Sequence, residues 1–268
     1  VSGGTSVAAL FMAGYIPGAL WALACMLVVY IYAKKAGYRS QTKLTGKEKF
    51  NAFIQALPCL LLIVIVIGGI IAGVFTATEG SVVAVVYSLL LSIYGYKSMK
   101  WKDLPEIFRA SAEMTGIIIF LIGVSSIMSW VMAFTNIPTM VSNGLLSISS
   151  NKYVILLMIN IILLVVGTFM DMTPATLIFT PIFLPVCTAL GMNTIHFGIM
   201  LIFNLCIGTI TPPVGTTLFV GVKVGGVKIE TVFKHLLPYF FAIIVVLMLV
   251  TYIPQLSLWL PGLMGYVS

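Results

Sequence analysis

The sequence predicts an all-α polytopic membrane protein, and three observations support this prediction. Of the 268 residues, 60% are hydrophobic and only 8% are charged, whereas a typical soluble domain has about 25% charged residues. Long apolar runs leave room for about eight membrane-embedded segments of about 20 residues each. The basic residues fall in short clusters between these runs, as the positive-inside rule predicts for cytoplasmic loops, so the net charge of +7 does not indicate nucleic-acid binding.

The first half of the chain is expected to contain uninterrupted spans at Phe11–Ala33, Leu57–Val74 and Val82–Tyr96. The connection after the first span is rich in Lys and Arg, which places it on the cytoplasmic side. Two amphipathic arms are expected around the next span, Thr115–Phe134. Trp101–Glu113 mixes polar and apolar residues at helical spacing and is expected in the cytoplasmic interface, and Ile137–Ser150 on the outer side.

A break in a membrane-embedded helix is predicted at Gly208–Thr217, which interrupts an apolar run from Phe197 to Val222. Pro212 and Pro213 have no N–H to donate and Gly215 adds flexibility, so several backbone carbonyls lose their partners in the helix. Lipid cannot satisfy these groups. Such backbone persists only where it is buried in protein or faces a cavity or an ion, so the break indicates a functional site.

A second break, Gly167–Thr176, lies earlier in the chain and carries Asp171. Its flanks, Tyr153–Val166 and Leu177–Leu190, are each too short to span a bilayer alone. They are expected to form a re-entrant hairpin that enters from the outer side, with Asp171 near its tip. We interpret the two breaks as parts of one site.

The expected organisation has two parts and a tail. Residues 1–110 would hold the end of a first repeat, scaffold spans and an interfacial arm, and residues 257–268 an outer C-terminal tail. Residues 111–256 would form a second, inverted repeat, comprising the outer arm, the re-entrant hairpin 151–190, the discontinuous helix 195–222, and an arm and final span at 225–256. This layout leaves every Lys and Arg except Lys152 on the inside.

An internal sequence similarity favours the inverted repeat. Residues 3–31 and 225–253 share a Gly-Gly pair, then Phe, Pro and Tyr-Ile, in the same order. The expected topology runs the two copies in opposite directions, which is typical of inverted repeats in transporters. The sequence opens on Val-Ser-Gly-Gly without Met or a basic leader, so we expect either that it starts within a longer protein or that processing has removed its start. If the repeat is real, only the tail of its first copy is present here, and an N-terminal half of the same subunit is missing.

Asp171 is the acidic residue deep within an apolar run, where a charge costs about 2.5–3.5 kcal/mol. It would either cap a half-helix or help to hold a cation and shape a substrate cavity. Hydroxyl and carbonyl oxygens without Lys or Arg suit Na⁺ better than a transition metal. Helix N-termini that open at the breaks suit a carboxylate. The hydroxyls belong to Thr168, Thr173, Thr176, Thr209, Thr211, Thr216 and Thr217.

Enzymatic motifs are not found in the sequence, so an enzyme is not expected. The four cysteines are scattered through apolar segments and the two histidines lack ligand spacing, so neither a disulfide framework nor a metal site is expected. Asn160 and Asn204 would either line a path or bond neighbouring helices. A proton-translocating or non-transporting membrane subunit is the main alternative to a transporter, but a proton relay would need several intramembrane ionisable residues.

Several motifs resemble the large membrane subunit of tripartite ATP-independent periplasmic (TRAP) transporters, and the resemblance covers essentially the whole chain, as its C-terminal part. The motifs are Phe169-Met170-Asp171-Met172-Thr173-Pro174-Ala175, Thr180-Pro181-Ile182-Phe183-Leu184-Pro185, Thr211-Pro212-Pro213-Val214-Gly215, Gly14-Tyr15-Ile16-Pro17-Gly18 and Thr78-Glu79-Gly80.

The resemblance implies a Na⁺-coupled elevator-type transporter of the bacterial inner membrane, without an organic cofactor. It would carry an organic acid such as sialic acid or a C4-dicarboxylate. Its partners would be a small membrane subunit, sometimes fused, and a periplasmic substrate-binding protein. The implied sodium ligands are Gly167, Thr168, Asp171, Thr173, Gly208, Thr209, Thr211, Pro212 and Gly215. The implied substrate-binding residues are Asp171, Met172, Thr173, Pro174, Thr176 and Pro213.

Overall fold

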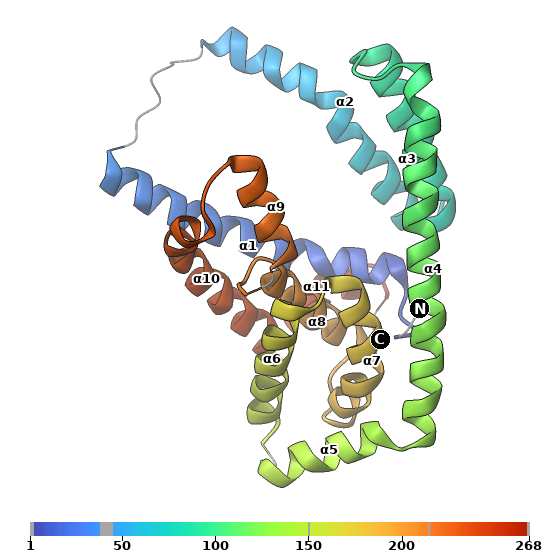
Figure 1. The fold of residues 1–268 in the computed structure, drawn as a ribbon, viewed down its shortest axis with the longest axis vertical. Coiled ribbons are helices and arrows are strands. Elements are labelled where there is room, and N and C mark those ends of the chain that lie inside the picture. Colours follow the sequence, from blue (N-terminus) through green and yellow to red (C-terminus); the bar gives the residue numbers. More distant parts are fainter. Residues whose placement is uncertain (1–2, 38–44, 150, 214, 267–268) are drawn as a thin grey trace. The chain divides into compact units, whose positions relative to one another are not determined.

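The computed structural model describes residues 3–37, 45–149, 151–213 and 215–266, and the regular elements within these ranges are all helices (Figure 1). In chain order they are α1 (Val7–Ala36), α2 (Gly46–Ile71), α3 (Ala77–Leu90), η1 (Leu91–Gly95), η2 (Trp101–Asp103), α4 (Leu104–Phe134), α5 (Ile137–Ile148), α6 (Lys152–Phe169), α7 (Met172–Ala189), α8 (Thr194–Thr209), α9 (Thr216–Gly225), α10 (Ile229–Tyr252) and α11 (Gln255–Leu263).

Within the described ranges, seven helices are long and apolar enough to cross a membrane. They are α1, α2, α3 with η1, the first part of α4 with η2, α6, α7 and α10. Many of their exposed side chains are large and apolar, such as Ile161, which is 53% exposed, and Phe241, which is 73% exposed. Lipid, rather than water, is the solvent that suits such a surface. The predicted class, an all-α multi-pass membrane protein, is confirmed.

The chain divides into two compact units. One consists of residues 37–118, and the other of residues 1–36 together with 119–268. In the first unit, α2 and α3 pack together, and the hydroxyl of Tyr87 donates to the Pro58 carbonyl at 2.8 Å. Both helices begin with a capping box. The Glu48 carboxylate accepts from the Thr45 N–H at 2.7 Å, and the Glu79 carboxylate accepts from the Thr76 N–H at the same distance.

The expected arm at Trp101–Glu113 is not a separate element. One continuous helix, α4, runs from Leu104 to Phe134. The arm joins the span because Pro105 occupies the second position of the helix, where a missing N–H costs nothing, and no Gly or Pro stands between Glu113 and Thr115. The domain boundary expected after residue 110 therefore falls inside a helix, as does the boundary between the two compact units.

Two further expectations near the C-terminus need correction. The arm and final span expected on either side of Pro238 form one helix, α10, which contains this proline; a proline can kink a membrane helix without ending it. The expected outer tail is largely helical, because α11 runs to Leu263. Ser257 and Pro261 of α11 are buried, and Leu258 packs against Ala9 and Ala13 of α1.

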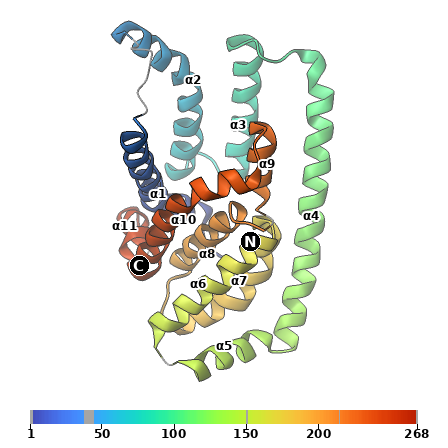
Figure 2. The ribbon, with the colours of Figure 1, turned by 60° about the vertical axis from the view of Figure 1, so that its left-hand side comes forward.

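The larger unit is built around α8. Figure 2 shows α6 and α7 packed on one side of α8, while α10 contacts it from another side. Phe197, Met200, Leu201 and Leu205 of α8 are at most 2% exposed. One apolar cluster joins α6, α7 and α8, and a second joins α8 to α10 with partly buried residues of α1. The short helix α8 is therefore the central helix of this unit, and the helices that form the candidate site pack against it.

Candidate functional site

The first part of the candidate site is the turn between α6 and α7. The side chain of Asn151 accepts from the Tyr153 N–H at 2.9 Å and begins α6. Asp171 is the N-cap residue of α7, with extended backbone angles. Each helix has 18 residues, or about 27 Å at 1.5 Å per residue. Both are longer than the apolar flanks suggested, because only Met170 and Asp171 of the predicted break are outside a helix. The expectation that each flank is too short to span a bilayer is therefore wrong, since each helix is long and apolar enough to cross a membrane.

The helices extend into the predicted break because its polar residues suit helix ends. The hydroxyl of Thr168 donates to the Val165 carbonyl at 2.7 Å, and that of Thr176 to the Met172 carbonyl at 2.7 Å. Pro174 lies in the first turn of α7, where the backbone N–H groups have no partner in the helix. Threonine and proline therefore mark the ends of these helices rather than a long irregular segment.

The second part of the site is the break between α8 and α9. Regular helix ends at Thr209 and resumes at Thr216. The peptide bond between Pro212 and Pro213 is cis, and Gly215 has φ +42°. A Cβ at Gly215 would lie 2.9 Å from the Thr211 carbonyl oxygen. Glycine is therefore required at residue 215 by both conformation and space. The helix break predicted from these proline and glycine residues is present.

The structure brings the two breaks into direct contact. A Cβ added to Gly208 of α8 would lie 2.4 Å from both Cα and C of Gly167 in α6, so the two backbones meet without side chains between them. The N–H of Gly215 donates to the Thr168 carbonyl at 3.3 Å. Two segments that the sequence analysis interpreted as one site are thus adjacent in space.

Oxygen atoms are concentrated at this contact. The hydroxyls of Thr209 and Thr211 donate to the carbonyls of Cys206 and Ile207 in α8, at 2.9 and 2.7 Å. Their donated hydrogens point back into α8, which leaves oxygen lone pairs free to accept or coordinate. α6 and α8 also end here, and the last carbonyls of a helix carry its negative dipole end.

The positive dipole ends of two helices lie beside the C-terminal ends of α6 and α8, because α7 begins after Asp171 and α9 begins after Gly215. A helix N-terminus presents N–H donors and a positive dipole end, which suit an anion such as a carboxylate. The arrangement can therefore hold a cation between two helix C-termini and a carboxylate near two helix N-termini.

Only some of the predicted site residues form the contact between the two breaks, and the others are exposed or half-buried beside it. Gly167, Thr168, Gly208 and Gly215 form it. Asp171, Met172 and Pro213 are exposed, and the Met172 sulfur lies 3.7 Å from Sγ of Cys206 in α8. The half-buried residues are Thr168, Thr173, Pro174, Thr176, Thr209, Thr211 and Pro212. Val214 and the side chain of Thr216 lie outside the described part of the structure.

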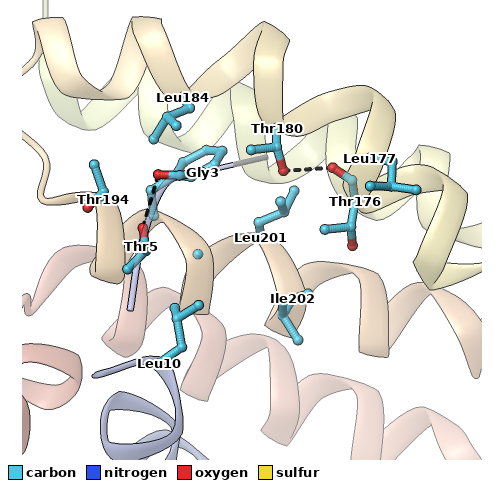
Figure 3. A pocket seen from close by; sticks show the side chains of 12 residues that line it. Gly3, Thr5, Leu10, Thr176, Leu177, Thr180, Leu184, Thr194, Leu201 and Ile202 are labelled. Carbon is cyan, nitrogen blue, oxygen red and sulfur yellow. Dashed lines mark hydrogen bonds between the residues drawn. The ribbon is translucent and has the colours of Figure 1, made fainter. Parts of the chain in front are cut away.

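A cavity of about 210 Å³ lies farther along α7, between this helix, α8 and the residues that lead into α1 (Figure 3). The polar side chains among its lining residues are threonines, and none of these residues is charged. The hydroxyl of Thr180 donates to the Thr176 carbonyl at 2.6 Å. Thr176 is the predicted substrate residue that lines this cavity. The other threonines that line it are Thr5, Thr180 and Thr194.

Sequence reasoning did not identify Thr180 and Thr194. The spacing of Thr176 and Thr180 places both on one face of α7, which was a usable signal. Thr194 and Thr5 come from other segments and only the fold brings them together.

Comparison with known proteins supplies the family. The family model of the tripartite ATP-independent periplasmic transporter, DctM component, matches residues 1–256. The chain is 52% identical over 262 residues to YgiK of Salmonella typhimurium, a protein described as uncharacterized; the match covers 98% of this chain and 60% of YgiK.

Two further relatives have assigned roles. The chain is 38% identical to the sialic acid TRAP transporter large permease protein SiaM of Vibrio cholerae, over 98% of this chain and 62% of SiaM. It is 37% identical to the C4-dicarboxylate TRAP transporter large permease protein DctM of Pseudomonas aeruginosa, over 97% of this chain and 61% of that protein.

The chain thus spans only 60–62% of the length of these relatives. The family match nevertheless extends from the first residue to the start of α11. The match, the helix breaks and the apolar helices agree on a multi-pass protein of the inner membrane. The chain belongs to the DctM component family of tripartite ATP-independent periplasmic transporters.

Proposed function

We propose that this chain is part of the large membrane subunit of a sodium-coupled secondary transporter that moves an organic acid across the inner membrane. The substrate would be a carboxylate such as sialic acid or a C4-dicarboxylate, which are the substrates named for two relatives. A periplasmic binding protein would deliver it, and a small membrane subunit, separate or fused, would complete the assembly with the remaining part of the large subunit.

The observation that carries this proposal is the contact between the two helix breaks. Na⁺ would bind between the ends of α6 and α8, with ligands drawn from Gly167, Thr168, Asp171, Thr173, Gly208, Thr209, Thr211, Pro212 and Gly215. The substrate carboxylate would bind beside it, near the N-termini of α7 and α9, with Asp171, Met172, Thr173, Pro174, Thr176 and Pro213 around it. Na⁺ would favour the transport-ready arrangement because it contacts both breaks at once in that arrangement.

Backbone geometry supports the inverted repeat on which an elevator mechanism would depend. Gly4 and Gly226 each have φ +61° and each precede the first residue of a helix, α1 or α10, by three positions. Both helices contain an interior proline. The rings of Tyr32, near the end of α1, and His235, near the start of α10, are 6.2 Å apart, as expected for two copies that run in opposite directions.

In the elevator mechanism that we propose, the hairpin α6–α7 and the broken helix α8–α9 move together with bound substrate, because the site depends on both. The uninterrupted helices α1, α2 and α3 would belong to the scaffold. Net positive charge that moves with the substrate would respond to the membrane potential by about 2.3 kcal/mol per charge per 100 mV.

The test is sodium-driven uptake by the complete transporter in proteoliposomes with its binding protein. We expect Asp171→Asn to reduce uptake at least about tenfold, or about 1.4 kcal/mol, because it removes the acidic group from the junction of the breaks. The matched control is Glu106→Gln, an exposed acid in α4, which should leave uptake unchanged. Wild-type uptake and sodium dependence in the Asp171 variant would contradict the proposal.

A further inference from the structure

A buried polar cluster joins three helices away from the breaks. Asn160 of α6 and Asn204 of α8 are fully buried, and Thr251 of α10 is 1% exposed. The side-chain N–H of Asn204 donates to Oδ1 of Asn160 at 2.6 Å. The side-chain N–H of Asn160 donates to the Thr251 hydroxyl oxygen at 3.2 Å. These residues bond neighbouring helices, which was one of two interpretations left open by the sequence.

The orientation of Asn204 is set by its partners. Its amide nitrogen also donates to the Met200 carbonyl at 2.8 Å. A flipped amide would place its oxygen against two acceptor oxygens, so the flip is excluded. Oδ1 of Asn204 is then buried without a partner among the described residues. A buried amide oxygen needs a donor, and one internal water would supply it.

The cluster and the glycine contact lie on the same interface. Asn160 meets Asn204, and further along both helices Gly167 meets Gly208. Residue numbers rise in the same direction on both sides, so α6 and α8 run parallel. The other buried side chains between them are apolar, including Ile159, Leu163 and Leu205. Apolar contacts are non-directional, so they fix the shift of one helix along the other less sharply than a buried hydrogen bond does.

The register matters because the space at the glycine contact is so small. A shift of one residue moves a helix about 1.5 Å along its axis and rotates the facing position. A side chain would then face a site where even a Cβ at Gly208 would lie 2.4 Å from the Gly167 backbone. A single buried asparagine is known to specify register in coiled coils.

We propose that Asn160, Asn204 and Thr251 are positioning residues that fix the register of α6 against α8, with an internal water on Oδ1 of Asn204. His196 adds a second polar link between α8 and α10, since its Nε2 lies 2.7 Å from the Val250 carbonyl oxygen. The cluster thereby holds Gly167 opposite Gly208. Its effect on transport rests on the proposed function, whereas its effect on register does not.

The register can be measured directly by cross-linking. Cys206 lies 3.7 Å from the sulfur of Met172, which is three residues beyond the end of α6 and therefore moves with it. Met172→Cys in the complete protein, with its other cysteines replaced, thus creates a pair that reports on the C-terminal end of α6 against α8. We expect the double substitution Asn160→Leu with Asn204→Leu to lower the rate of cross-linking about tenfold, equivalent to about 1.4 kcal/mol. Both amides are removed together, so neither is left buried without the other, and only the Thr251 hydroxyl of the cluster remains.

The matched control is Leu163→Met in the same interface, a buried and volume-conserving change, which should keep the cross-linking rate within about twofold of the parent. If the double variant does not accumulate in the membrane, Thr251→Val is used in its place, and we expect it to lower the rate of cross-linking by a smaller factor. Cross-linking of the double variant, or of Thr251→Val in its place, at the parent rate would overturn the register role.

Transport gives an independent readout in the same proteins without the added cysteine. We expect the sodium concentration for half-maximal uptake to rise at least about fivefold in the double variant, and to stay unchanged in Leu163→Met, because only the former disturbs the breaks. Slower cross-linking with unchanged sodium dependence would overturn the positioning role. If uptake proves independent of Na⁺ altogether, the proposed function fails while the cross-linking result still decides the register.

Discussion

Helix ends are stabilised in different ways in the two regions of this protein. In the unit of residues 37–118, α2 and α3 are each capped by a threonine and a glutamate from their own first turn. At the breaks, the ends of α6, α8 and α9 are stabilised by one another, through the glycine contact and the bond from Gly215 to Thr168. A helix end that is capped by its own residues needs no other segment. A helix end that is stabilised by a distant segment can be affected, together with that segment, by a ligand that binds between them.

The largest effect is expected at the glycine contact. Gly208→Ala would place a Cβ 2.4 Å from the backbone of Gly167, and no flexible side chain can move out of its way. The breaks must then separate, so we expect sodium-driven uptake to fall about a hundredfold, or about 2.7 kcal/mol. The measurement is initial uptake in proteoliposomes at matched protein amounts.

Gly68→Ala in α2 is the matched control, because a Cβ there would meet nothing within 4 Å. It should transport at the parent rate. Equal uptake by the Gly208 variant would show that the breaks do not need this close approach.

A second glycine pair sharpens the comparison between local strain and tertiary fit. Gly215 and Gly226 both have positive φ, but only a Cβ at Gly215 would be obstructed, by the Thr211 carbonyl at 2.9 Å. Gly226→Ala should cost about 1–2 kcal/mol of stability from conformation alone. Gly215→Ala should add a loss of uptake of about tenfold. Similar uptake by the two variants in the same assay would remove the special role assigned to Gly215.

The smallest effect is expected at a locally capped end. Glu79→Ala removes the carboxylate that accepts from the Thr76 N–H and hydroxyl. We expect it to lower the free energy of unfolding by about 1 kcal/mol, as for other lost caps. The sodium dependence of uptake should not change. Thermal unfolding in detergent measures the first effect, and a changed sodium dependence would show that this end, too, is coupled to the site.

The sequence predicted the membrane class and both helix breaks because these depend on local chemistry. Proline, glycine and an isolated aspartate in apolar runs disrupt a helix at their own positions. The structure has irregular backbone at Met170–Asp171 and between α8 and α9. The contact of Gly167 with Gly208 was not predictable in detail. It depends on how two helices cross, which no single segment encodes.

The incorrect predictions have a common physical reason. The arm at Trp101–Glu113 joins α4, and the arm before Pro238 joins α10, because mixed polarity does not break a helix. The threonines near the breaks lie within α6 and α7, where their hydroxyls donate to carbonyls of the same helix three or four residues earlier. Polarity along the chain predicted where the environment changes, but not where the backbone bends.

The most direct test of the central claim, that both breaks form one sodium site, is to count the sodium ions bound by the purified complete protein. Equilibrium binding of radioactive Na⁺ should show one fewer ion per protein in Gly208→Ala than in the parent. Asp171→Asn should show the same loss or a strong decrease in affinity, and Gly68→Ala should match the parent. Unchanged stoichiometry and affinity in both site variants would contradict the account.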